Sequence, residues 1–360
     1  MVIPFFVVVR VDRITMGHGA GGSLTLQLVK NHVLKALGGS PFEVPLEALD
    51  DAAVVDGIVL KSDSHTVKPL FFPGGDIGRL AVSGTVNDIA VIGAEPVALA
   101  AGMVLEEGLP LPDFERILES MRATCLEAGV WIVTGDTKVV EKGSLGGMII
   151  NTSGIGRRGE ALEHNLKVVR RFRPDFRARW LLDSNLKPGD KIIVSGTMGD
   201  HGVALLSFRE GYGFGYELKS DVAPINRLTG MLLAEVGGIV AMKDPTRGGL
   251  ATSLNEWAEK SGVGILIREE AIPIREGVRA ACEMLGLDPL EIGNEGKAVI
   301  GVVPEKAEEV LEALRSHPQG REAQIIGEAT SRFEGVIVET QVGGRRPLPP
   351  PLGDPIPRIC

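Results

Sequence analysis

Glycines cluster near the start of the chain, in the run GHGAGGS at positions 17–23, directly before apolar residues at helical spacing between Leu24 and Leu37. Clustered glycines let backbone N–H groups approach phosphate oxygens, and a helix N-terminus adds a favourable dipole. The run matches neither the Walker pattern nor the Rossmann fingerprint, and a plain turn explains it equally well when it is taken alone. The candidate phosphate contacts in this run are Gly17, His18, Gly19, Gly21 and Gly22.

Acidic residues stand at the ends of several expected elements. Mg²⁺ prefers carboxylate oxygens shared with substrate phosphates, so carboxylates at such positions suit a metal–nucleotide site. A solvated acid or a helix cap is the ordinary interpretation of any one of them. Asp88 is different, because it lies in the apolar run VNDIAVIGA, where a half-buried carboxylate needs a partner. The candidate nucleotide contacts among these polar residues are Asp51, Asp63, Asn87, Asp88, Asp136, Thr137 and Asp244.

Charged side chains next to expected strands suggest proton handling and charge stabilisation. Lys138 follows Asp136 and Thr137 in TGDTK, and could neutralise a transferring phosphate. Glu295 precedes another strand in NEGK and could serve as a base. From spacing alone, an ordinary salt bridge is the simpler interpretation of each. The run DPTRGGL, which begins at Asp244, fits a helix-capping turn and a phosphate or metal contact comparably well.

The chain ends in a cysteine, Cys360, on the proline-rich segment GGRRPLPPPLGDPIPRIC. Hydrophobic periodicity is absent there, so no packed core is expected, and an extended polyproline chain of this length could span about 50 Å. A prenylation signal would need the cysteine four residues from the end. A thiol on such an arm could be modified at one site and delivered to another.

Periodicity along the chain predicts an α/β (α+β) protein. Strands and helices alternate through the first part of the chain, with strands around 52–60, 96–106, 130–140 and 146–156 and helices around 75–93 and 111–128. A basic, low-apolar stretch follows, and mixed strands and helices resume at 187. We therefore expect a domain at 1–160, an interdomain segment at 161–186, a second α/β domain at 187–342 and a mobile tail at 343–360.

Composition argues against a nucleic-acid-binding, a disulfide-stabilised or a membrane protein. The chain has 360 residues and a formal net charge of −9, which argues against a nucleic-acid partner. Its three cysteines are far apart, so a disulfide framework is not expected and a reducing cytoplasm is favoured. The apolar residues 1–9 are too few to span a membrane and lack the basic residues of a signal peptide.

Together, GHGAGG, DDAAV, SDSHTVKPLFFPGGDIG, SGTVNDIAVIGAEPVAL, VTGDTKVV, SGTMGDHG, DPTRGGLA, NEGK and the terminal PRIC closely resemble the HypE family of hydrogenase maturation proteins. The resemblance covers nearly the whole chain. That family belongs to an ATP-binding superfamily with aminoimidazole ribonucleotide synthetase, selenophosphate synthetase and thiamine-monophosphate kinase. The middle motifs are those of the superfamily, and PRIC singles out the family. The resemblance implies a homodimer of N-terminal α/β domains that holds ATP at its interface, and a second α/β domain.

The resemblance also implies a reaction. A carbamoyltransferase, HypF, places a carbamoyl group on the terminal cysteine, here Cys360, and the enzyme uses ATP to dehydrate it to a thiocyanate. The cyanide then passes to iron on a HypC–HypD scaffold for the NiFe-hydrogenase centre. The glycine loop would close over ATP, and Lys138 and Glu295 would handle protons and charge. By this resemblance the carboxylates that hold Mg²⁺ and phosphates are Asp51, Asp63, Asp88 and Asp244.

Two segments of this chain depart from the pattern of the family, and two other functions are alternatives to the one that the resemblance implies. Residues 168–180 look like a basic insertion, which we interpret as a solvated loop rather than a docking surface. Residues 1–13 look like an extension, and we assign no function to them. A small-molecule kinase or ligase of the same superfamily would leave the tail incidental, although selenophosphate synthetase is disfavoured because no cysteine accompanies the glycine loop. An ATP-bound scaffold whose tail only docks onto partners is the other alternative.

Overall fold

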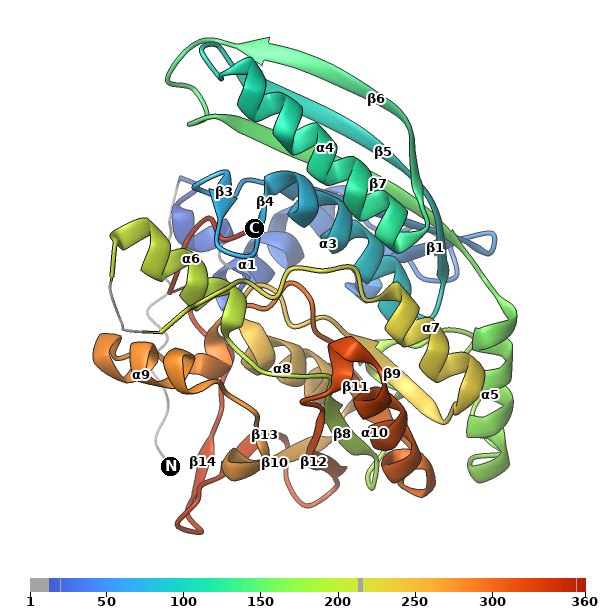
Figure 1. The fold of residues 1–360 in the computed structure, drawn as a ribbon. Coiled ribbons are helices and arrows are strands. Elements are labelled where there is room, and N and C mark those ends of the chain that lie inside the picture. Colours follow the sequence, from blue (N-terminus) through green and yellow to red (C-terminus); the bar gives the residue numbers. More distant parts are fainter. Residues whose placement is uncertain (1–12, 20, 213–215, 354) are drawn as a thin grey trace.

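The computed structural model describes residues 13–19, 21–212, 216–353 and 355–360. The N-terminal extension expected from the sequence lies almost entirely outside this part of the chain. The elements of Figure 1 are, in chain order, α1 (Ser23–Leu28), α2 (Leu34–Leu37), β1 (Ala53–Val55), β2 (Ile58–His65), β3 (Phe71–Phe72), β4 (Gly75–Asp76), α3 (Ile77–Val91), β5 (Glu95–Glu106), α4 (Leu111–Ala128), β6 (Trp131–Val140), β7 (Met148–Arg157), α5 (Glu160–Phe172), β8 (Lys191–Val194), α6 (Asp200–Glu210), α7 (Asn226–Glu235), β9 (Ile239–Lys243), α8 (Gly249–Ser261), β10 (Gly264–Arg268), α9 (Glu276–Leu285), β11 (Val299–Val302), α10 (Ala307–Ser316), β12 (Gln324–Thr330), β13 (Gly335–Glu339) and β14 (Arg345–Pro347). A π-helical turn, Val29–Val33, joins α1 to α2, so the predicted helix at 24–37 is present as one helical segment.

The first domain is built on a five-stranded sheet with the order β1-β2-β7-β5-β6. Only β5 and β6 run parallel, and the other neighbours are antiparallel. Helices α3 and α4 pack on this sheet, as Figure 1 shows. Nearly every residue of α3 is buried, because its sequence IGRLAVSGTVNDIAV presents small or apolar side chains on all sides. The carboxylate of Asp76 caps its N-terminus and accepts hydrogen bonds from Gly78 N and Arg79 N.

The run at 52–60 folds differently from the single strand predicted for it. It forms a hairpin, because the residues Asp56 and Gly57 both adopt positive φ and reverse the chain between β1 and β2. Asp63 consequently lies inside β2 rather than after a strand. The hairpin brings β2 alongside β7 over its full length.

The second domain contains a seven-stranded sheet with the order β14-β13-β10-β12-β8-β11-β9. Only β10 and β13 are parallel neighbours. Strands β9 and β11 are buried at every position, which fits their continuous apolar sequences. Trp257 of α8 is fully buried in the core beside this sheet. No helix in the described part of the chain is long and apolar enough to cross a membrane.

The interdomain segment is packed, so our interpretation of residues 168–180 as a solvated loop is wrong. Helix α5 extends through Phe172 and buries Val168 and Val169. Beyond it, Phe176 and Trp180 are also buried. Arg173 forms an ion pair with Asp190, whose side chain is fully buried. At least one arginine of the basic run, Arg173, therefore makes a buried structural contact. The apolar side chains of the same run pack into the core and hold the segment between the domains.

Candidate active site

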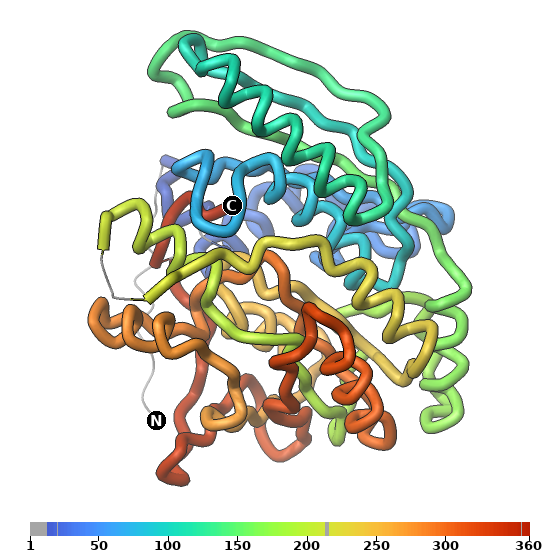
Figure 2. The backbone as a smooth tube through the Cα atoms, viewed as in Figure 1, coloured from blue at the N-terminus to red at the C-terminus, as the bar shows by residue number. Residues whose placement is uncertain are grey.

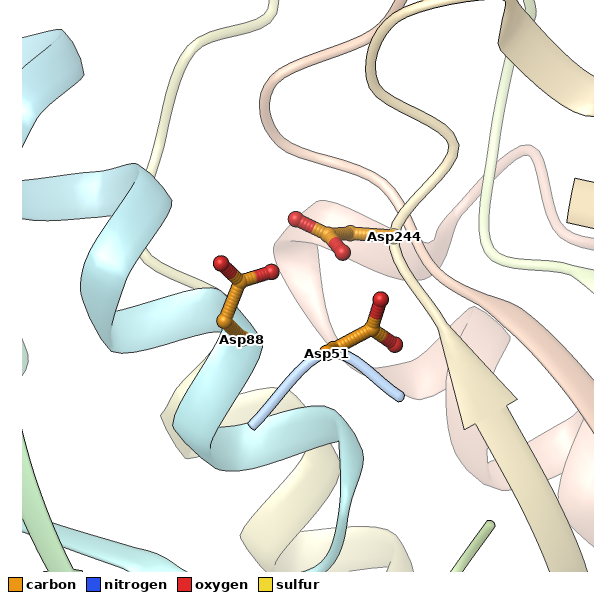
Figure 3. A group of neighbouring side chains, drawn as sticks. All are labelled: Asp51, Asp88 and Asp244. Atoms are coloured by element: carbon orange, nitrogen blue, oxygen red, sulfur yellow. The ribbon is translucent and has the colours of Figure 1, made fainter. Parts of the chain in front are cut away.

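Three predicted carboxylates converge where the two domains meet. Asp51 lies on the loop before β1, Asp88 on α3, and Asp244 directly after β9 (Figure 3). Each contributes an oxygen that lies within 4.8 Å of the others. Asp88 and Asp244 are buried, and Oδ2 of Asp244 has no hydrogen-bond partner. Two buried carboxylates and one half-buried carboxylate, with an unsatisfied oxygen among them, are a donor set that fits a hard divalent cation such as Mg²⁺.

The charges around this cluster are strongly coupled. Burial raises the pKa of Asp88 well above its usual range, and the negative charge of Asp244 adds to this effect while Lys61 opposes it. Burial and the neighbouring Asp51 raise the pKa of Asp244 to about 7. Burial is also the main cause of the raised pKa of Asp51. Burial and mutual repulsion thus favour the protonated forms of these carboxylates, and a cation that enters the cluster would favour their ionised forms.

Lys61 of β2 joins Asp63 to this cluster. Its Nζ lies 2.7 Å from Oδ2 of Asp88 and 3.4 Å from Oδ1 of Asp63. Burial opposes a low pKa for Asp63, but Lys61 and a hydrogen bond with Asp88 hold that pKa below its usual range. Asp63 thus stays ionised beside Lys61. Nothing in the sequence pattern singled out Lys61, since a lysine in a half-exposed strand is common.

A cavity of about 610 Å³ opens beside the carboxylates. Gly21 and Gly22 line one wall, and Asp51, Lys61 and Asp244 line another. This size and the mixture of apolar walls with a few polar groups are typical of a small-molecule site. Gly17, His18 and Gly19 are not among its lining residues. They belong to a short 3₁₀ turn, Met16–Gly19, in which Thr15 Oγ1 lies 2.8 Å from His18 Nδ1.

The glycine loop packs against the loop that follows Asp244. Gly21 has φ +76°, and a Cβ there would collide with Arg247. Arg247 Nη1 also donates a hydrogen bond to Gly19 O at 3.0 Å. Gly248 and Gly249 both have positive φ at the start of α8. The two glycine-rich runs therefore form one backbone-lined corner of the cavity, and Arg247, from the run DPTRGGL considered for a phosphate or metal contact, is a cation there.

Asn87 and Glu295 have different roles from each other. Asn87 Nδ2 donates to Ala223 O and Glu295 O, and its Oδ1 accepts from Ile225 N. Its amide thereby joins the domains and does not line the cavity.

Glu295 is 2% exposed, and its Oε1 lacks a hydrogen-bond partner. Burial raises the pKa of Glu295 well above its usual range, and Asp244 raises it further.

Asp136, Thr137 and Lys138 are not gathered with the carboxylates in this chain. They lie on β6, an edge strand whose residues Trp131–Val139 are all exposed. Lys138 Nζ pairs with Asp136 Oδ2 at 2.9 Å, and both side chains are about two-thirds exposed. Asp136 and Thr137 line a separate hollow. The salt bridge that spacing alone favoured is thus the arrangement observed.

The C-terminal segment is docked, contrary to the expectation that nothing in 343–360 packs. Strand β14 pairs with β13, and Pro351 O accepts a hydrogen bond from Ser23 N. Ile356 and Ile359 are buried in a hydrophobic cluster to which both domains contribute. The trace in Figure 2 shows this segment returning to the first domain.

Cys360 is held at the end of β2. Thr66 donates to Cys360 O from its backbone N at 3.0 Å and from Oγ1 at 3.1 Å. The side chain of Ile359 lies against Gly293, two residues from Glu295. His201 Nε2 lies 2.7 Å from Ile359 O. The last two residues therefore dock between Thr66, which follows the strand that carries Lys61, and Gly293 of the loop that carries Glu295.

The fold and the carboxylate site define a two-domain protein of the AIR synthase related class. Residues 49–158 match the model described as AIR synthase related protein, N-terminal domain, and residues 187–339 match that of the C-terminal domain. The carbamoyl dehydratase HypE of Azotobacter vinelandii is 47% identical over 354 residues, which cover 98% of each chain. The chain belongs to the HypE family of carbamoyl dehydratases, which act in hydrogenase maturation.

Two solved structures are similar throughout. HypE in complex with ATP superposes with a TM-score of 0.77 at 42% identity, covering 97% of this chain and 100% of that one. HypE from a HypE–HypF complex gives 0.81 at 44% identity, covering 90% and 99%.

Proposed function

We propose that this carbamoyl dehydratase uses ATP to convert an S-carbamoyl group on Cys360 into a thiocyanate. The observation that carries the proposal is the docking of the tail, in which Thr66 holds Cys360 O beside the strand that bears Lys61 and Asp63. A terminal cysteine whose segment docks against the end of this strand is suited to be a covalently attached substrate.

ATP would occupy the cavity beside the glycine loop. Gly21 and Gly22 carry no side chain and so let the backbone approach phosphate oxygens closely, and Arg247 adds a positive charge. The complex of ATP with a HypE relative supports this placement. Asp51, Asp88 and Asp244 would hold Mg²⁺, and Asp63 would keep Lys61 in place beside them. When bound, Mg²⁺ supplies the positive charge that neutralises the phosphates.

The proposed chemistry conserves every atom. The carbamoyl oxygen attacks the γ-phosphorus and ADP leaves, so that a poor leaving group becomes a phosphate ester. The two protons on nitrogen are removed, the C–O bond breaks, and a C≡N triple bond remains on sulfur. The carbamoyl oxygen departs in inorganic phosphate, and the overall loss from Cys360 is one water.

Glu295 and Lys138 are the proposed proton-handling and charge-stabilising groups. The unpartnered Oε1 and raised pKa of Glu295 suit a group that holds and exchanges a proton. Within one chain Lys138 is not in a position to act at the carboxylate site, because it pairs with Asp136 on the exposed strand β6. We therefore propose a homodimer joined through β6, whose exposed apolar residues Trp131 and Val133 would otherwise face water. A second copy covering this edge is what would bring Lys138 and Asp136 into an enclosed site.

Loading and delivery require partners. The similarity to HypE from a HypE–HypF complex supports a HypF-type carbamoyltransferase as the donor. We propose that a HypC–HypD scaffold in the cytoplasm accepts the cyanide for the iron of a NiFe-hydrogenase. Both exchanges need Cys360 outside its docked position, so the segment after β14 must leave and return.

Mass spectrometry of the carbamoylated protein tests the proposal. Addition of ATP and Mg²⁺ should remove one water mass, and fragmentation should locate the change at Cys360. Cys125 and Cys282, which are buried, should remain unmodified throughout. ATP hydrolysis without any mass change at Cys360 would point to a small-molecule kinase or a scaffold instead.

A further inference from the structure

A buried ionic network lies directly behind Asp51, outside the residues assigned so far to the reaction. At its centre is Lys243, the last residue of β9, whose side chain is 8% exposed. Lys243 Nζ lies 2.7 Å from Asp51 Oδ1, 3.2 Å from Asp183 Oδ2 and 3.0 Å from Glu256 Oε2. One ammonium group thus joins a carboxylate of the candidate metal site to two carboxylates that are not part of it.

Asp183 anchors this network between the domains. It lies in the segment that connects them, and its side chain is 1% exposed. Trp257 Nε1 donates to Asp183 Oδ1 at 2.8 Å, and Lys260 Nζ lies 2.6 Å from Asp183 Oδ2. The Asp183 N–H donates to Asp50 Oδ1 at 2.9 Å, next to Asp51 in the chain. The position of Lys243 is therefore fixed from several directions by buried groups.

The three carboxylates of the metal site differ in how their backbones are held. Asp88 is part of the long helix α3, and Asp244 directly follows a buried strand. Asp51 lies on a loop before the three-residue strand β1, so its backbone gives its side chain less support. Lys243 reaches this carboxylate from the second domain. A lysine so enclosed by carboxylates stays charged, because Asp183 and Asp51 raise its pKa more than burial lowers it.

We infer that Lys243 is a positioning residue, anchored by Asp183, which holds the carboxylate of Asp51 toward Asp88 and Asp244 and so sets the affinity of the site for divalent cation and nucleotide. The inference rests on the proposed function of that site. Side chains that hydrogen-bond metal-ligating carboxylates typically contribute about 10–100-fold to metal affinity. The position of the Asp51 carboxylate also depends on how the two domains are placed relative to each other, because Asp51 belongs to the first domain and Lys243 to the second.

The test compares Lys243→Met with Lys260→Met in the full-length protein. Both substitutions remove an ammonium group that contacts Asp183 and the loop at 49–51, but Lys260 bonds Leu49 O whereas only Lys243 contacts the carboxylate of Asp51. Binding of a non-hydrolysable ATP analogue is followed by calorimetry as Mg²⁺ is varied. We expect Lys243→Met to raise the Mg²⁺ concentration for half-maximal binding by about tenfold or more, and Lys260→Met to leave it within about threefold. Lys243→Arg, which keeps a charged donor, is expected to retain most of the wild-type affinity.

Protein folding is monitored by thermal melts of each variant. If Lys243→Met does not fold, Lys243→Gln, which keeps a polar donor in the buried site, should shift the Mg²⁺ requirement in the same direction. Unchanged or tighter Mg²⁺ binding in folded Lys243→Met or Lys243→Gln protein would overturn the inference while leaving the proposed function intact. A wild-type protein that binds no nucleotide with Mg²⁺ would instead remove the proposed function, and the inference with it.

Discussion

Arg209, in the last turn of α6, is expected to keep the C-terminal segment docked. Its guanidinium donates to Pro357 O at 2.7 Å and to Arg358 O at 3.0 Å. Its Nε and Nη2 also donate to Lys68 O, at 2.9 Å and 2.6 Å. One side chain thereby ties the tail to the first domain, and Arg209→Ala should weaken this tie.

The size of the effect follows from the number and exposure of these bonds. A hydrogen bond from a charged donor contributes about 1.5–3 kcal/mol when buried, and less in an exposed setting such as this one. Two of the bonds reach the tail, so we expect a loss of about 1–2 kcal/mol in docking free energy. The undocked fraction should then rise by about 5–30-fold.

Carboxypeptidase digestion followed by mass spectrometry measures that fraction. Because Ile359 is 1% exposed, release of the last two residues must await undocking. If redocking is faster than cleavage, the rate of release follows the undocked population. Arg332→Ala is the matched control, since Arg332 is exposed and pairs with Glu328. Equal release rates for Arg209→Ala and the wild type would refute the assigned contact.

Four further outcomes are expected. Asp88→Asn should weaken binding of ATP with Mg²⁺ by at least about tenfold, measured by calorimetry, and unchanged affinity would remove Asp88 from the site. Glu295→Gln and Lys138→Ala should still bind ATP but slow dehydration, by about a hundredfold or more for Glu295→Gln, and normal turnover by single-turnover mass spectrometry would reject either role. Because the pKa of Asp244 rises from 3.8 to about 7 on folding, the unfolded chain releases this proton first as pH increases. The contribution of Asp244 should therefore lower stability as pH rises through that window, and added Mg²⁺ should remove this loss, as read from melting temperatures between pH 5 and 8. Trp131→Glu, at a residue that is 62% exposed on β6, should convert a dimer to monomers in sedimentation velocity, and an unchanged mass would place the interface elsewhere.

Local patterns predicted the helix that carries Asp88 and the turn that begins at Asp244, but the single strand predicted after Asp51 is a hairpin, and the strand before Asp244 was not predicted. The apolar run around Asp88 is typical of a buried helix, and the glycines after Asp244 are typical of a turn before a helix. These two local signals were sufficient to predict the helix and the turn that position Asp88 and Asp244. Their convergence was not visible, because it depends on the packing of two domains. Lys61 and Lys243 were missed for the same reason: a lysine on a strand signals nothing until its buried partners are known.

Two segments were misjudged for different reasons. Helix α5 carried a usable signal, since Leu162, Leu166 and Val169 follow helical spacing within the basic run, and the density of arginines obscured it. The tail carried no such signal. Its docking depends on two isolated side chains, Ile356 and Ile359, and on backbone carbonyls that accept hydrogen bonds from distant residues.

The proposed dehydration is tested most directly by following the carbamoyl oxygen. Protein carrying an ¹⁸O-labelled carbamoyl group on Cys360 is given ATP and Mg²⁺, and the inorganic phosphate is analysed by mass spectrometry. The proposed activation by phosphorylation predicts one ¹⁸O atom in each phosphate released as the thiocyanate forms. Thiocyanate formation with unlabelled phosphate and the label in water would contradict it.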